Sequence, residues 1–327
     1  MDILEFLNDD PQVLRRRINL VSARTDISEI LIEKDLWVTF LLKYLFGESP
    51  WKDHILFKGG TCLSKCYGAV DRFSEDIDIL LDWRVLGYGA DGPAVEPSRK
   101  KQENSNELLV ERTGRFIAEE FVPALQRDLS GMIDKPIKVR ADGLDIRIGY
   151  PALFASEYVT SEVLIEMGPR GRWGTPVEKT ISSYVSQNID ALDDSASVRC
   201  IPLEQAFCEK VQILHTAAAR GKVPSRYSRH YYDVYMIRTK IGHMPIDHDM
   251  LARNAEYDRR FYPGAKYGYD TMAPGTYRLT PTEDMLPLLK DDYRKMESMI
   301  FGPIPSFEDI LNEMAEVENE LNGEPPY

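Results

Sequence analysis

Two short segments decide the fold. They read Ile55-Leu56-Phe57-Lys58-Gly59-Gly60-Thr61 and Glu75-Asp76-Ile77-Asp78-Ile79-Leu80-Leu81-Asp82. The apolar run before the glycines predicts a buried strand that enters a turn, and Leu63, Tyr67 and Val70 then recur at helical spacing. The second segment alternates at first between acidic and apolar residues, which predicts another strand. The order strand, Gly-Gly turn, short helix and Asp-x-Asp strand is the basis of the functional prediction.

Asp76 and Asp78 place two carboxylates on one side of the predicted strand, because residues two apart in a strand point to the same face. Like charges at this spacing repel each other unless a cation lies between them, and oxygen ligands suit Mg²⁺ or Mn²⁺. Gly59 and Gly60 let the backbone approach a phosphate, and the next helix begins with unpaired N–H groups. We therefore predict a metal site beside a nucleotide site. Each element taken alone has a simpler explanation: the alternating acids could form a solvated strand edge, and the two glycines could form an ordinary turn.

The remaining pattern predicts an α+β fold, with a mixed sheet and flanking helices followed by a helical C-terminal half. Further strands are expected at about 137–139, 144–150 and 163–167, and helices at about 106–129, 203–219, 231–240 and 285–300. We place a first domain at residues 1–195 and a second at residues 196–327. The Gly-, Pro- and charge-rich segment 87–107 is expected to be a mobile excursion, and the acidic tail from Glu316 is expected to fray.

Composition limits the class of protein. The 327 residues, 43% of them hydrophobic, suit a globular protein of one large or two moderate domains. No run is long enough to span a membrane and Met1–Glu5 lacks a basic region, so a cytoplasmic location without a membrane partner is expected. A net charge of −13 argues against general, non-specific binding of nucleic acid. The four cysteines form no CxxC pair and are expected to be reduced thiols.

A local basic stretch contrasts with the acidic total. From residue 210 to residue 240 the only acid is Asp233, and the basic residues are Lys210, Arg220, Lys222, Arg226, Arg229, Arg238 and Lys240. A solvated helix face explains such a run, but Arg226 and Arg229 are also candidates for contact with RNA phosphates. Asp233 has a competing role as the partner of Arg229, four residues earlier on one helical face.

Glu166 lies inside the apolar segment Val163-Leu164-Ile165-Glu166-Met167. A carboxylate in such a strand needs a partner. Glu166 is therefore either a third acid of the transferase site, taking a proton from the attacking hydroxyl or completing the metal shell, or the partner of Arg170 or Arg172 in a salt bridge.

The segment from Phe57 to Lys65, with Arg72-Phe73-Ser74-Glu75-Asp76-Ile77-Asp78, resembles the AbiEii/AbiGii toxin family. These are nucleotidyltransferase-like toxins of type IV toxin–antitoxin and abortive-infection systems, with a polymerase-β-like core. The resemblance extends over most of the chain through segments 33–38, 203–210, 229–235, 269–276 and 292–293. Cys62, where a small serine is expected, and the segment 87–107 depart from the family pattern.

The resemblance implies roles for single residues. Ser74 and Asp76 match a metal- and nucleotide-binding motif, Lys210 matches an essential lysine, and Asp233 matches an essential acid. A cation near a triphosphate would neutralise charge in the transition state, so Lys210 and Asp233 are expected in the same cleft as the carboxylates. The nucleotide site is then expected to consist of Gly59, Gly60, Thr61, Lys65 and Ser74.

The resemblance also implies the partners: an NTP as donor, tRNA as acceptor at its 3′ end, and a cognate antitoxin that need not bind the toxin directly. Two other functions stay open. One is nucleotidylation of a small molecule, as in aminoglycoside-modifying transferases. The other is a non-catalytic nucleotide-binding protein of the same fold, against which the intact Asp76, Asp78, Lys210 and Asp233 count.

Overall fold

The computed structural model describes residues 1–89, 91–154, 160–190, 192–242 and 244–323. The chain divides into two compact units. The first unit contains Met1–Cys66, Ser74–Pro93 and Glu107–Ile201, and the second contains Tyr67–Phe73, Ala94–Asn106 and Pro202–Tyr327. Two early segments, Tyr67–Phe73 and Ala94–Asn106, thus group with the C-terminal half. The expected boundary after residue 195 divides the chain at one point only, and it stays a prediction. None of the helices described is long and apolar enough to cross a membrane.

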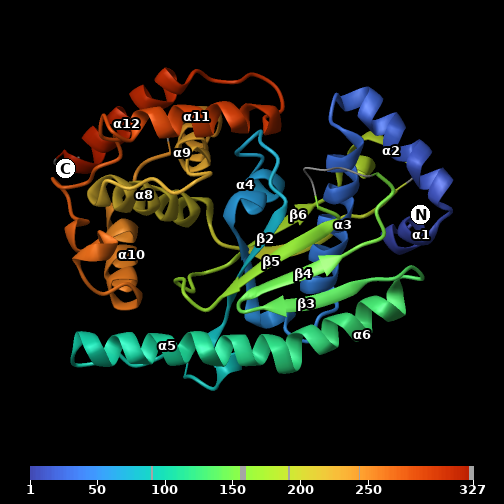
Figure 1. Ribbon diagram of the computed structural model, residues 1–327, viewed down its shortest axis with the longest axis horizontal. Helices are drawn as coiled ribbons and strands as arrows, with labels where there is room; N and C mark the ends of the chain where they lie inside the picture. The colour runs from blue at the N-terminus through green and yellow to red at the C-terminus, as the bar shows by residue number, and fades with distance from the viewer. Residues whose placement is uncertain (90, 155–159, 191, 243, 324–327) are drawn as a thin grey trace. The chain divides into compact units, whose positions relative to one another are not determined.

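The first unit is built on a mixed sheet that has seven strands in the part of the chain described (Figure 1). Their order is β3 (Lys138–Asp142), β4 (Asp145–Gly149), β5 (Glu162–Gly168), β2 (Asp76–Leu81), β1 (Ile55–Lys58), β7 (Ala196–Cys200) and β6 (Val177–Ile181). Strand β2 is antiparallel to β1 and parallel to β5, and β1 is parallel to β7. The predicted α+β class with a mixed sheet is confirmed.

Strands β1 to β5 lie where the sequence pattern predicts strands, but β6 and β7 were not expected. The residues of β6 read Val177-Glu178-Lys179-Thr180-Ile181, and only Ile181 is buried. An edge strand with two charges at its centre carries little hydrophobic signal, because one of its sides has no neighbouring strand to pack with.

Helices cover the sheet of the first unit. Helix α3 (Glu29–Gly47) is buried along most of its length and packs on β5 and β7. Helix α6 (Val122–Met132) packs on β3, and α2 (Pro11–Thr25) packs on α3 (Figure 1). The remaining helical segments are α1 (Ile3–Asn8), η1 (Lys52–His54), α4 (Gly59–Tyr67), η2 (Trp83–Leu86), α5 (Arg99–Phe116), the π-turn η3 (Ile117–Phe121) and α7 (Tyr184–Asn188).

The expectation of a mobile excursion over residues 87–107 is wrong for its second half, because α5 begins at Arg99. The start of this helix belongs to the second unit, where Asn106 is buried. Its Nδ2 donates hydrogen bonds to the carbonyl oxygens of Arg260 and Phe261 at 2.9 and 3.1 Å. Polar residues that look like a loop in sequence are here the buried contacts of a helix.

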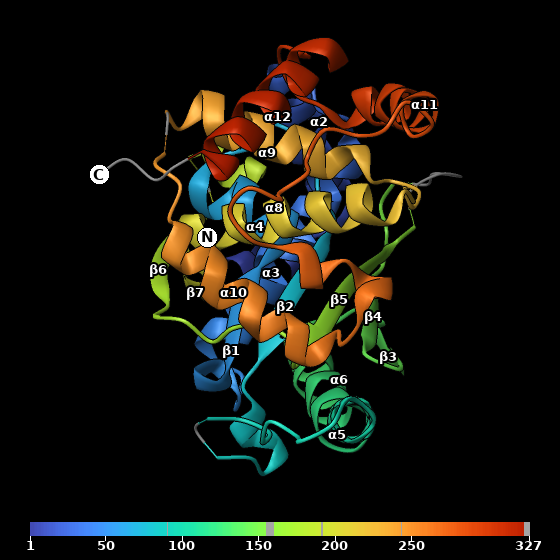
Figure 2. The ribbon, with the colours of Figure 1, turned by 90° about the vertical axis from the view of Figure 1, so that its left-hand side faces the viewer.

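The second unit consists of helices around α9 (Ser228–Lys240), which contacts α8 (Leu203–Arg220), α11 (Leu286–Met296) and α12 (Phe307–Asn322). Figures 1 and 2 both show α8 and α9 side by side. Helix α10 (His248–Phe261) packs on α8, and short turns η4 (Ala265–Tyr267), η5 (Tyr269–Thr271) and η6 (Glu297–Met299) complete the unit. The predicted helical C-terminal half is confirmed.

The expected fraying from Glu316 is wrong as far as Asn322, where α12 ends. Val317 and Leu321 are fully buried, and Asn322 exchanges two hydrogen bonds with the backbone of Tyr277, at 2.8 and 2.9 Å. The acidic side chains between these apolar residues have partners of their own: Glu318 accepts from the Leu279 and Thr280 N–H groups at 2.6 and 2.8 Å, and Glu320 pairs with Arg238. Composition alone does not reveal these contacts. The last four residues, 324–327, lie outside the described residues.

Candidate functional site

Four acidic residues lie together on the sheet of the first unit. In the parallel pair of β2 and β5, Asp78 lies opposite Glu166, and Asp76 lies opposite Leu164. Glu166 also lies opposite Asp145 of β4, on its other side. Since paired residues in adjacent strands project to the same face, the acids at 76, 78, 145 and 166 gather on one side of the sheet. The alternation in sequence predicts that Asp76 and Asp78 share a face, and sheet register adds the other two acids.

The charges in this cluster act on Glu166. Partial burial and the neighbouring charge and hydrogen bond of Asp78 raise the pKa of Glu166 to about 7, and Asp76 and Asp145 contribute in the same direction. An arginine partner such as Arg170 or Arg172 would act in the opposite direction on this pKa. Glu166 retains contact with solvent. A carboxyl group that is poised near neutrality can take or give a proton at physiological pH.

Gly59 lies against Asp78, with no room for a side chain between them. Its φ of +79° is in the left-handed region, and a Cβ atom there would come within 1.8 Å of the Asp78 Oδ2 atom. Gly60 is buried in the first turn of α4, and the Thr61 hydroxyl donates a hydrogen bond of 2.6 Å to the Asp76 carbonyl oxygen. The glycine turn, the start of α4 and the carboxylates are therefore next to one another. The first N–H groups of a helix are those that lack intrahelical acceptors and can bind an anion.

Lys65 and Ser74, both expected at the nucleotide site, differ in their contacts. The Lys65 ammonium forms an ion pair of 2.6 Å with Asp35 and donates to the Thr39 hydroxyl and the Ser182 carbonyl oxygen. These three partners match the three N–H donors of a lysine, which favours a structural role for Lys65. Ser74 is half-buried in the segment that enters β2.

A second cluster of charges lies in the second unit and centres on Asp233. Asp233 is fully buried on α9 and accepts hydrogen bonds from Arg72 Nε and Nη2 at 2.7 and 2.9 Å. Lys210 Nζ of α8 lies 2.9 Å from Asp233 Oδ2 and 3.3 Å from His230 Nδ1. The ammonium can only donate, so His230 accepts at Nδ1 and carries its proton on Nε2.

The ion pairs determine the protonation of this cluster. Burial alone would raise the pKa of Asp233, but the cations of Arg72 and Lys210 outweigh it and hold the pKa below its usual range. Burial and the Lys210 charge lower the pKa of His230, which keeps its ring neutral. Asp233 therefore pairs with Arg72 and Lys210, rather than with Arg229 as the alternative reading of the helix suggests. Arg72 received no role from the sequence, although it stands two residues before Ser74 in the quoted motif.

The two arginines expected to contact RNA flank the start of α9. Arg226 is exposed, and its backbone has a φ of +60°. Asp292 fixes this turn by accepting from the backbone N–H groups of Arg226 and Ser228 at 2.7 and 2.8 Å. Arg229 is half-buried, and its Nε has no hydrogen-bond partner among the residues described. Both side chains remain candidates for binding an anion.

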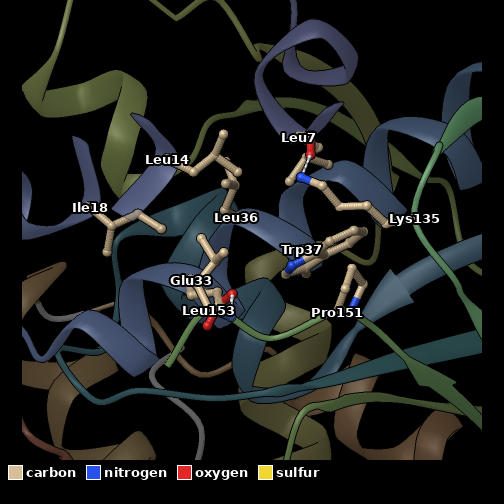
Figure 3. A pocket seen from close by; sticks show the side chains of 9 residues that line it. All are labelled: Leu7, Leu14, Ile18, Glu33, Leu36, Trp37, Lys135, Pro151 and Leu153. Carbon is tan, nitrogen blue, oxygen red and sulfur yellow. Dashed lines mark hydrogen bonds between the residues drawn. The ribbon is translucent and has the colours of Figure 1, made fainter. Parts of the chain in front are cut away.

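A small cavity in the first unit does not resemble a ligand site. Figure 3 shows its lining by apolar side chains together with Glu33 and Lys135. Both polar heads already bind backbone: Glu33 accepts from Leu153 N at 2.6 Å, and Lys135 donates to Leu7 O at 2.8 Å. The free volume of about 10 Å³ is hardly enough for one water molecule. This cavity is a packing feature of the core.

The chain is similar to known nucleotidyltransferase toxins along most of its length. No curated protein matches the chain. A solved structure with detectable similarity is MenT4, the nucleotidyltransferase toxin Rv2826c from Mycobacterium tuberculosis H37Rv. It has 16% sequence identity and a TM-score of 0.44, and the alignment covers 96% of this chain and 98% of that one. Residues 41–313 match the family model described as nucleotidyl transferase AbiEii toxin of type IV toxin–antitoxin systems. This match spans the glycine turn, the four acids on the sheet of the first unit and the buried charge cluster of the second, and the chain therefore belongs to the AbiEii family of nucleotidyl transferase toxins.

Proposed function

We propose that the protein is a metal-dependent toxin that transfers a nucleoside monophosphate from an NTP to the 3′ end of tRNA in the cytoplasm. The observation that carries the proposal is the set of carboxylates held against a glycine turn, with Asp78 opposite Glu166 and Asp78 Oδ2 against Gly59. Membership of the AbiEii family supports transfer of a nucleotide as the reaction.

The donor set fits a hard divalent cation. Asp76, Asp78 and Glu166 offer only carboxylate oxygens, and partial burial together with the charges of Asp78 and Asp76 raises the pKa of Glu166. Mg²⁺ and Mn²⁺ prefer such oxygen ligands and leave positions for triphosphate oxygens. We assign Asp76 and Asp78 as the metal ligands. The bound cation would neutralise charge on the triphosphate and polarise the phosphorus that is attacked.

The residues around the carboxylates would position the reactants. The first turn of α4, from Gly59 to Thr61, would donate N–H groups to phosphate oxygens, with Ser74 beside the nucleotide. Glu166, with a pKa of about 7, would take the proton from the attacking hydroxyl group. Bond formation at the α-phosphorus then releases pyrophosphate.

Lys210 and Asp233 are proposed to serve the same reaction. Among the residues described, the Lys210 ammonium has two partners, Asp233 and His230, which leaves one of its three N–H donors for a phosphate oxygen. Asp233 and Arg72 would hold this ammonium in one orientation. Lys210→Ala should abolish transfer by protein that remains folded. If transfer declines only in proportion to the folded fraction, Lys210 has a structural role alone.

A basic groove in the second unit supports a polyanionic acceptor. It has a volume of about 610 Å³, and four arginines and two glutamates line it. These residues are Arg99, Arg253, Arg259, Arg260, Glu96 and Glu256. Local positive charge of this kind attracts a phosphate backbone even on a protein whose total charge is negative. Arg226 and Arg229 would add to this contact.

The deciding experiment incubates the protein with each labelled NTP in turn, Mg²⁺ and total RNA, and resolves the RNA by size. Label in tRNA that is lost after removal of the 3′ nucleotides supports the proposal. Label in a small metabolite instead would favour the small-molecule alternative. Nucleotide binding that requires the metal, without transfer to any acceptor, would favour a non-catalytic role.

A growth experiment tests whether toxicity requires catalysis. Asp76→Asn keeps the shape of the side chain but removes a charge from the metal site, so the variant should be harmless at a soluble level where the wild type arrests growth. An antitoxin encoded nearby should protect cells from the wild type, with or without direct binding. Equal toxicity of both proteins would show that the toxin acts by sequestering a partner.

A further inference from the structure

Three cysteines that are separate in sequence meet beside the glycine turn. Cys62 and Cys66 lie one helical turn apart on α4, and Cys200 ends β7 opposite Phe57 of β1. Their sulfur atoms all lie within 4.8 Å of one another. Cys62 and Cys200 are buried, and Cys66 is partly exposed. The sequence contains no metal-binding spacing here, because β7 contributes the third thiol only through the parallel pairing of β1 and β7.

The spacing of the sulfurs fits one thiophilic cation. A zinc–sulfur bond is about 2.3 Å, so three thiolates around one ion place their sulfurs roughly 4 Å apart. The observed separations need only a small contraction to reach this value. A buried set of three sulfurs excludes hard ions such as Mg²⁺, which prefer oxygen, and favours soft or borderline ions. The partly exposed Cys66 gives an ion a route from solvent.

The metal-free cluster consists of protonated thiols. Burial raises the pKa of Cys62 well above its usual value, and contact with Cys200 raises the pKa of Cys66. Lys65, next to Cys66, acts in the opposite direction on this thiol. The Cys200 thiol lies 3.5 Å from the Val177 carbonyl oxygen, to which it can donate a weak hydrogen bond. Three protonated thiols in contact form only weak hydrogen bonds with one another. A cation would replace these weak contacts with three strong metal–sulfur bonds.

We propose that Cys62, Cys66 and Cys200 form a binding site for one thiophilic divalent cation of the Zn²⁺ and Cd²⁺ class. Each of the three thiols loses its proton to water as its sulfur bonds to the ion, so three protons leave and the complex carries one net negative charge. Solvent at the exposed side of Cys66 supplies the fourth ligand. The ion links α4, whose first residue is Gly59, to β7, and thereby stabilises the glycine turn.

The test titrates reduced full-length protein with Cd²⁺ while thiolate-to-metal charge-transfer absorption is recorded. This absorption arises only from sulfur ligands, so binding at Asp76 and Asp78 does not contribute. We expect one equivalent of Cd²⁺ per chain, three protons released, and displacement of Zn²⁺ bound beforehand. Asp78→Asn should retain the absorption, which makes this test independent of the proposed transferase reaction.

Matched variants identify the ligands. Cys66→Ala and Cys62→Ser should weaken or abolish the absorption, and the second change installs the serine expected from the family resemblance. Cys208→Ala, on α8 in the second unit, should leave both the absorption and the stoichiometry unchanged. Unfolding measured in a chelator checks that each variant is folded. Absence of the absorption in the wild type, its persistence in Cys66→Ala, or its loss in Cys208→Ala or Asp78→Asn would overturn the site.

Discussion

The two charge clusters differ in how their charges are balanced. In the first unit, four acids lie on one side of the sheet, and partial burial together with the charges of Asp78, Asp76 and Asp145 raises the pKa of Glu166 to about 7. In the second unit, Asp233 is even more buried, yet its pKa is lowered because Arg72 and Lys210 both contact it. Negative neighbours dominate the charges that act on Glu166, whereas cations dominate the charges that act on Asp233.

Under the proposed function, this difference would distinguish a cation-binding site from a set of charges that positions its own members. A set of like charges costs folding free energy and is stabilised when a cation arrives from solution. A buried set of opposite charges is complete without a ligand, and it orients the groups that compose it. Under the proposed function, the first cluster would bind the cation and the second would hold Lys210 in a fixed position.

The largest effect should follow from breaking the balanced cluster. Asp233→Leu leaves the cations of Arg72 and Lys210 buried without a counter-charge, which typically costs about 3–5 kcal/mol of folding free energy. Chemical denaturation of wild type and variant measures the change. Asp291→Leu is the control, because Asp291 forms surface ion pairs with Arg294 and Lys295. The stability of this variant should be almost unchanged. Equal effects of the two substitutions would show that Asp233 is not a buried anchor.

Removing a charge from the carboxylate cluster should reduce activity without reducing stability, in contrast to Asp233→Leu. Asp78→Asn should slow transfer by several kcal/mol of activation free energy, roughly a thousandfold, because the metal loses a ligand charge. The metal-free protein should be as stable as the wild type or slightly more so, since one repulsive charge is gone. Transfer rates and thermal unfolding in a chelator measure both quantities. Asp142→Asn, at the exposed end of β3, serves as control and should change neither.

Gly59→Ala tests the close approach between turn and carboxylate. Gly59 and Gly143 both have positive φ, +79° and +64°, but a Cβ atom would meet Asp78 only at Gly59. Backbone strain should cost both alanine variants about 1 kcal/mol or slightly more, and Gly59→Ala should lose more than Gly143→Ala because Asp78 must also move. Only Gly59→Ala should also weaken metal-dependent nucleotide binding, which titration calorimetry measures. Similar binding by both variants would remove the turn from the nucleotide site.

The smallest effect concerns pH. The pKa of Glu166 is raised from 4.5 to about 7, so folding favours its protonated form. Its contribution to stability is fully present below pH 4.5 and is lost as the pH rises through about 7. The metal-free wild type should therefore lose more stability between pH 5 and pH 8 than Glu166→Gln, as thermal unfolding measures. Saturating Mg²⁺ should reduce the difference, and identical pH profiles without metal would contradict the proposed repulsion.

Much of the fold follows from local pattern. The strands β1 to β5 and the helices α8, α9 and α11 lie close to their predicted positions, because apolar periodicity within each segment reflects its buried face. Strand β6 is missed because an edge strand with Glu178 and Lys179 at its centre has no such periodicity. Strand β7 is also missed, although its buried residues alternate with more exposed ones. The start of α5 was mistaken for a loop because its buried contacts, Gln102 and Asn106, are polar.

The candidate site was predictable in part. Asp76 and Asp78 and the adjacent Gly59 are close in sequence, and a strand places alternate residues on one face whatever the rest of the chain does. Glu166 could be suspected from its apolar surroundings, but the register between β2 and β5 is needed to bring it to Asp78. Lys65 shows the limit of a motif match, because its ammonium is already occupied by Asp35, Thr39 and Ser182.

The sequence by itself determined the paired carboxylates and the glycine turn, because each lies within one short segment. It also determined the membership of a toxin family, because several segments along the chain resemble that family. Only the tertiary structure decided which distant groups meet. Arg72 reaches Asp233 across 161 positions, and Cys200 reaches Cys62 and Cys66 through the pairing of β7 with β1. Such contacts depend on the order and direction of the strands and on helix packing. No periodicity of a single segment encodes them.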